Sequence, residues 1–127
     1  MPMSNYLRNA IVNVTLRNTA YTAPVTAYVA LYTSDPTVAD TGTEVTGGAY
    51  ARQSAAFDTP TVGATANTAN ITFPTATADW GVVTHIGVRD ALTAGNLLYS
   101  APLTTARTIL TGDQLVILAG QLTDTLT

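Results

Sequence analysis

The chain has 127 residues, of which 10% are charged and 46% are hydrophobic; this length predicts one domain, residues 1–127. Five arginines, no lysine and eight acidic residues give a net charge of -3, which excludes the basic surface that nucleic-acid binding requires. The absence of cysteine excludes disulfides and thiol chemistry, and a charged fraction far below the usual about 25% predicts a surface that is neutral or covered by something else.

The first predicted element is a helix over residues 4–17. Ser4 can cap its N-terminus, and Leu7, Ile11 and Val14 recur on one face at the helical spacing. Such a short helix needs a sheet or a partner subunit to pack on. We therefore expect Leu7 and Ile11 to lie at a subunit interface.

From residue 25 the apolar pattern changes to period two, which indicates strands. Both rows of residues 25–32 are apolar, which predicts a strand covered on both faces. Pro102 is expected to end one strand before the next begins. The predicted fold is mainly β, an antiparallel β-sandwich of seven or eight short strands with one N-terminal α-helix, and its strands cover residues 25–32, 49–57, 69–73, 82–89, 96–103, 105–110, 114–118 and 121–126.

No pattern of catalytic or metal-binding residues emerges. The lone histidine, His85, lies within a predicted strand and is interpreted as bonded to a neighbouring group rather than as a general base. The carboxylates near glycine-rich loops are interpreted as turn caps, and their spacing fits no EF-hand calcium loop; they are Asp35, Asp40, Glu44 and Asp58. We predict no enzyme activity, no cofactor and no metal.

Three further residues are interface candidates. Arg52 and Arg89 lie on predicted strands, and the planar guanidinium suits protein interfaces, although cross-strand pairing is the ordinary alternative. Trp80 precedes Gly81, so it is either a core residue at a corner of the sheet or an interface anchor.

Several blocks of the chain resemble a group of small virion proteins of tailed bacteriophages. The resemblance lies in residues 29–37, 42–53, 73–81 and 83–88 and in Asp90-Ala91. Proteins of this group are labelled tail-fibre proteins, and similar small β-proteins serve as capsid cement or decoration. The resemblance implies no catalytic residues. The group's Gly-Gly-Asn turn is replaced here by Ala94-Gly95-Asn96, and because Ala disfavours positive φ, a different turn type is expected.

These observations favour a structural protein of the virion. The chain has no repetitive shaft, so a capsid cement or decoration protein on the major capsid protein shell is expected ahead of a tail-associated module, such as a tail-fibre-like or fibre-adaptor protein; a carbohydrate-binding module is the third alternative. We expect a homo-oligomer that binds the major capsid protein or a tail protein, with no nucleic acid and no membrane. With no signal peptide apparent, synthesis in the host bacterial cytoplasm is expected, followed by assembly into the virion.

Overall fold

The computed structural model describes residues 1–126. Within them, one helix is followed by eight strands, all paired antiparallel. The prediction of a mainly β fold with one N-terminal helix is therefore confirmed. The elements are α1 Asn5–Leu16, β1 Ala27–Tyr32, β2 Gln53–Ala55, β3 Ala64–Ala66, β4 Ile71–Thr72, β5 Gly81–Arg89, β6 Leu97–Ile109, β7 Val116–Ile117 and β8 Thr123–Thr125.

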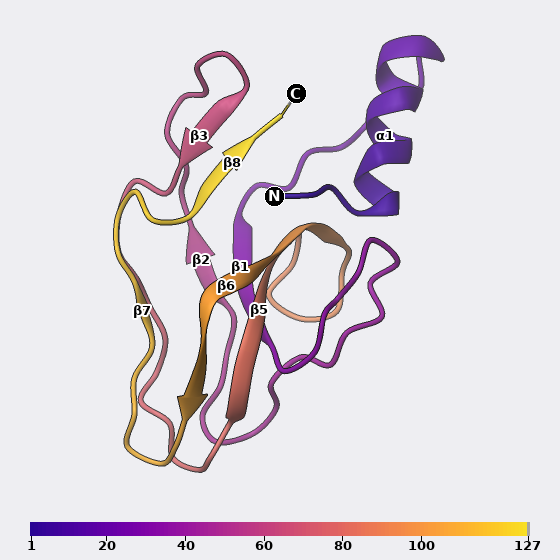
Figure 1. Cartoon of the computed structure of the whole chain (residues 1–127). Coiled ribbons are helices and arrows are strands. Elements are labelled where there is room, and N and C mark those ends of the chain that lie inside the picture. Colours follow the sequence, from indigo (N-terminus) through magenta and orange to yellow (C-terminus); the bar gives the residue numbers. More distant parts are fainter. Residues whose placement is uncertain (127) are drawn as a thin grey trace.

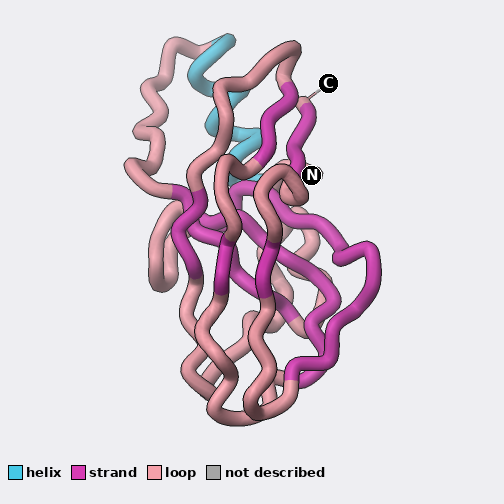
Figure 2. The backbone as a smooth tube through the Cα atoms, turned by 90° about the vertical axis from the view of Figure 1, so that its left-hand side faces the viewer, coloured by secondary structure: helices cyan, strands magenta, loops and turns pink. Residues whose placement is uncertain are grey.

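The main sheet contains four strands in the order β2-β1-β5-β6. Two further ladders, β4-β7 and β3-β8, are built from short strands. Figure 1 shows the long strands β5 and β6 side by side, with the β7 segment beyond them. In Figure 2 the short strands lie in the layer nearest the viewer, and the longer strands cross behind them.

The core fills the space between these layers. Val29 and Leu31 of β1 and Val83 of β5 are fully buried and pack in one cluster with Ile71 of β4 and with Phe73. On the other face of β1, Ala30 and Tyr32 pack against Leu97. Strand β1 is thus covered on both faces, as its pattern predicted.

Helix α1 begins where the sequence indicated. The Ser4 hydroxyl accepts a hydrogen bond from the Leu7 backbone N–H at 3.1 Å and itself donates to the Leu97 carbonyl of β6. Because Ser4 is buried, this cap also fixes the helix to the sheet. The helix then projects to one side of the sandwich (Figure 1). Among residues 1–126 no helix has the length and apolar character needed to cross a membrane.

Local predictions of the strands are wrong at two places: β3, residues 64–66, lies outside the predicted strand ranges, and a predicted strand end at Pro102 is absent. Pro102 does not end a strand, because β6 runs through it from Leu97 to Ile109; proline is tolerated at an edge and beside a bulge, and between the pairs His85–Pro102 and Val83–Arg107 the register of β6 shifts. Ala94 adopts a positive φ of 52° although alanine disfavours that region, and Gly95 has φ of 72°; the expected difference in turn type from the resembling group stays a prediction.

Candidate functional site

Arg52 is engaged inside the chain. Its Nε and one terminal nitrogen donate to the two carboxylate oxygens of Glu44 at 2.8 and 2.7 Å. The other terminal nitrogen donates to the carbonyls of Ala91 and Ala94, both at 2.8 Å. The Tyr50 hydroxyl donates to the same Glu44 carboxylate at 2.7 Å. This arrangement ties the loop before β2 to the turn between β5 and β6.

Arg89 ties the same turn to another part of the same β1–β2 loop. Its two terminal nitrogens donate to the two carboxylate oxygens of Asp40 at 2.8 and 2.9 Å, and they also donate to the Tyr32 hydroxyl and the Gly95 carbonyl. Burial alone would lower the pKa of Arg89, but the bonds to Asp40 and Tyr32 outweigh it and raise that pKa. The guanidinium is therefore charged at any physiological pH, and it holds the loop after β1 against the sheet.

The electrostatics of Glu44 follow from the same contacts. Burial acts to raise the pKa of Glu44, but the hydrogen bonds from Arg52 and Tyr50 outweigh it and lower the pKa below its ordinary value. The pKa of Tyr50 rises, first because it is buried and then because its hydroxyl donates to Glu44. The carboxylate is thus ionised and the phenol neutral, which is the arrangement of a structural ion pair.

Trp80 lies in the core. Its side chain is 5% exposed, its ring packs edge-to-face on Tyr50 with centroids 5.5 Å apart, and its Nε1 donates to the Gly48 carbonyl at 2.8 Å. Arg52 and Arg89 are also buried, at 8% and 7%. All three side chains thus have partners within the chain. Their role as interface residues stays a prediction.

The helix residues divide into two groups. Leu7 is buried against the sandwich, and Ile11 is half-buried. Val12, Val14 and Leu16 are 50%, 45% and 80% exposed. One part of the helix therefore packs on its own chain while its far end presents apolar side chains to solvent, and contact of Leu7 and Ile11 with another subunit stays a prediction.

The polar residues near the loops serve structure. His85 is half-buried, and its Nδ1 is 2.8 Å from the Thr84 hydroxyl, in agreement with its interpretation as a sheet residue bonded to a neighbour. Asp35 caps a turn by accepting from the Thr37 N–H at 2.8 Å. For Asp40 and Glu44 turn capping is wrong, because both pair with arginines. No group of three or more His, Asp or Glu residues in the described part of the chain could hold a metal ion.

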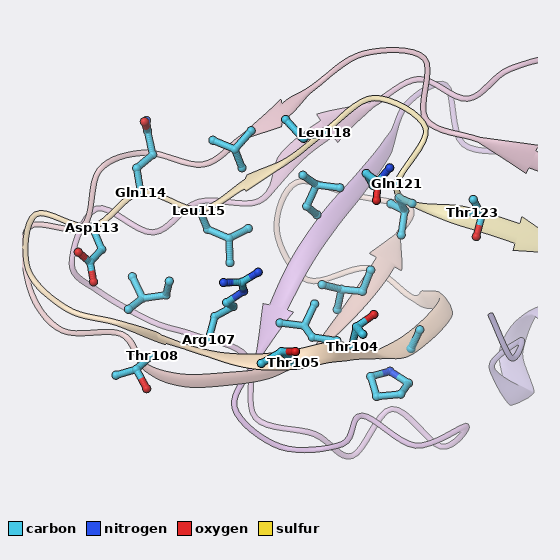
Figure 3. A pocket seen from close by; sticks show the side chains of 18 of the residues that line it. Thr104, Thr105, Arg107, Thr108, Asp113, Gln114, Leu115, Leu118, Gln121 and Thr123 are labelled. Atoms are coloured by element: carbon cyan, nitrogen blue, oxygen red, sulfur yellow. The ribbon is translucent and has the colours of Figure 1, made fainter.

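A concave surface lies between the outer edge of β6 and the segment that contains β7. We call it the β6–β7 groove and define it as the space between residues 101–109 and residues 113–118, with a volume of about 930 Å³. Its floor includes the buried side chains of Ile86, Leu115 and Leu122. Figure 3 shows Arg107 between the two walls, across from Leu115, with Thr104 and Thr105 beside it on β6.

The groove is sparsely charged. Its walls carry hydroxyl and amide groups, and the lining contains two charged side chains, Arg107 and Asp113. A nucleophile with an adjacent base is not among these residues. Sequence reasoning did not identify the groove, although it predicted a strand over residues 105–110, which form part of one wall.

The comparisons with known proteins now identify the family. No curated protein matches the sequence. Residues 2–125 match the family model described as podophage GP4 fiber I protein gp80. This match extends over almost the whole chain, and so the chain belongs to that family of phage fibre proteins.

Proposed function

We propose that the chain is a non-enzymatic structural component of a phage tail, as a tail-fibre-like or fibre-adaptor protein. Membership of a fibre protein family implies a virion component that associates with other virion proteins. The match over residues 2–125 carries the proposal. The β6–β7 groove and the apolar end of α1 support it, because both are surfaces suited to protein contacts and neither carries a catalytic arrangement.

A capsid cement protein was the first expectation from the sequence, because the chain has no shaft. The family description favours the tail, since it names a fibre protein. Copy number separates the two roles. A tail component is expected in a handful to a few tens of copies per particle, whereas a cement protein covers the shell in hundreds.

The test is quantitative mass spectrometry of purified particles against the major capsid protein, combined with immunogold labelling. We expect a low copy number and label clustered at the tail vertex. Label spread over the whole capsid, with a copy number comparable to that of the major capsid protein, would contradict the tail role and support cement.

We also propose that the chain forms a homo-oligomer in which a second copy covers the exposed end of α1. Val14 and Leu16 are 45% and 80% exposed, and burial of each such side chain contributes about 1.5–3 kcal/mol. The double variant Val14→Ser, Leu16→Ser should therefore shift the sedimentation of the protein toward monomer. Val62→Ser is the control, because Val62 is 94% exposed on a turn outside the helix. A monomeric wild-type protein at assembly concentrations would contradict this proposal.

A further inference from the structure

The outer edge of β6 has a neighbour along its first part. The N-terminal segment lies against it: the Ser4 N–H donates to the Leu98 carbonyl at 2.8 Å, the Ser100 N–H donates to the Pro2 carbonyl at 3.3 Å, and Met3 pairs with Tyr99. From residue 101 onward the same edge faces the β6–β7 groove. Among residues 1–126, no backbone hydrogen bond joins residues 101–109 to residues 114–118 across that groove.

An open strand edge is a template for another strand. We propose that the β6–β7 groove binds an extended segment of a different virion polypeptide, which adds to β6 beside residues 103–109, beyond Pro102, which has no backbone N–H to pair, and follows on from the chain's own residues 2–4. This inference rests on the proposed function, because it names how the chain joins its partner. A segment opposite residues 103–109 spans at most about 23 Å at about 3.3 Å per residue, because the register shift of β6 in this stretch shortens the strand.

The shape of the groove favours a single extended segment over a second copy of this chain. Residues 101–109 form one wall and residues 113–118 form the other, so an occupant that pairs with β6 lies between the two walls. Each described strand of a second copy already carries a hydrogen-bonded neighbour, and that neighbour would meet the opposite wall. A segment with no sheet of its own brings no such neighbour.

The groove also constrains the side chains of its occupant. In a strand, alternate side chains point to opposite faces. One row of the occupant would meet the buried apolar floor at Ile86, Leu115 and Leu122, which favours small or medium apolar residues. Arg107 lies in the groove and has no ion-pair partner among the described residues. The occupant is thus an apolar extended segment with an acidic residue near Arg107.

The absence of native cysteine makes a direct test possible. Thr105→Cys places one thiol on the β6 wall, and Gln121→Cys places one on the opposite side of the groove; Val62→Cys is the control on an exposed turn. Each variant is treated with a fluorescent maleimide, first as the free full-length chain and then in purified particles. We expect both groove cysteines to react at least tenfold more slowly in particles and Val62→Cys to react equally in both.

Other results would overturn the inference. Equal reactivity of both groove cysteines in particles and free chain would show that the groove is open after assembly. Protection that appears in the free chain as its concentration rises would make a second copy the occupant. A benzophenone maleimide at Thr105→Cys in particles should cross-link to a different polypeptide, and a cross-link to this chain alone would contradict the proposal.

Further measurements test strand addition and the role of Arg107, and they distinguish a failure of this inference from a failure of the proposed function. Amide hydrogen exchange at residues 103–108 should slow in particles if a strand is added, and unchanged exchange would exclude strand addition. Arg107→Gln should reduce incorporation into particles several-fold, whereas Arg17→Gln on the exposed end of the helix region should not. If the chain is absent from tails, the proposed function fails; if it is present with an open groove, this inference alone fails.

Discussion

Replacement of Arg52 by Met should destabilise the isolated chain. The substitution removes four charge-assisted hydrogen bonds, two of which go to Glu44. Glu44 would keep the bond from Tyr50 alone, and breaking a buried ion pair costs about 3–5 kcal/mol. Because the Glu44 side chain is 23% exposed, water compensates in part, and we expect a loss of about 3 kcal/mol. That is a large share of the about 5–15 kcal/mol of a small domain.

Urea denaturation of the full-length protein measures this loss. Arg107→Met is the matched control, because Arg107 is exposed and has no ion-pair partner among the described residues; it should change the free energy of unfolding by at most about 0.5 kcal/mol. A double-mutant cycle that combines Arg52→Met with Glu44→Gln should give a coupling energy of about 1–3 kcal/mol. If Arg52→Met behaves like its control yet reduces incorporation into particles, Arg52 acts at an interface and the structural argument is wrong.

Three further predictions concern the loops. Ala94→Gly should stabilise the protein by about 0.5–1 kcal/mol in thermal unfolding, because Ala94 has φ of 52°; Ala51→Gly, which is not in that conformation, should not stabilise. Gly48→Ala should cost at least about 1 kcal/mol more than Gly47→Ala, because both have positive φ but an added Cβ at Gly48 would lie 2.8 Å from the Ala78 carbonyl and the Trp80 ring nitrogen, while Gly47 has open space. Glu44→Gln should flatten the pH dependence of stability. Because the pKa of Glu44 is lowered in the fold, its carboxylate stabilises the fold at pH values above the ordinary pKa of 4.5, and this stabilisation is lost as the pH falls through the lowered pKa.

The central part of the fold was predictable because its signals are local. The alternation in residues 25–32 and 82–89 corresponds to β1 and β5, and Ser4 marks the start of α1. The peripheral strands were predicted too long: residues 49–57 contain the three-residue β2, and residues 114–118 contain the two-residue β7. Alternation shows which residues face the core, but the length of a strand depends on the neighbouring strand with which it pairs.

The polar contacts were not predictable, because they join distant parts of the sequence. Arg89 and Asp40 are 49 positions apart, and the bonds from Arg52 end on backbone carbonyls that carry no sequence signature. Ala94 shows the same limit. Its carbonyl accepts from Arg52 at 2.8 Å and from Arg89 at 3.4 Å, so tertiary contacts hold the alanine in a conformation that local preference disfavours.

The ion pairs within the chain leave fewer unpaired charges on the surface than the composition alone indicates. Among the described residues, two of the five arginines and three of the eight acidic residues are used in ion pairs with an arginine or the N-terminal amine, namely Asp40, Glu44 and Asp124; Asp35 also lies 3.8 Å from His85 Nε2. The surface is therefore even less charged than the composition indicates, while the end of α1 and the floor of the β6–β7 groove remain apolar. Few like charges are left to oppose association at either surface. Contacts that are weak singly become strong when an assembly repeats them, so a sparsely charged surface is compatible with a protein that functions inside a virion.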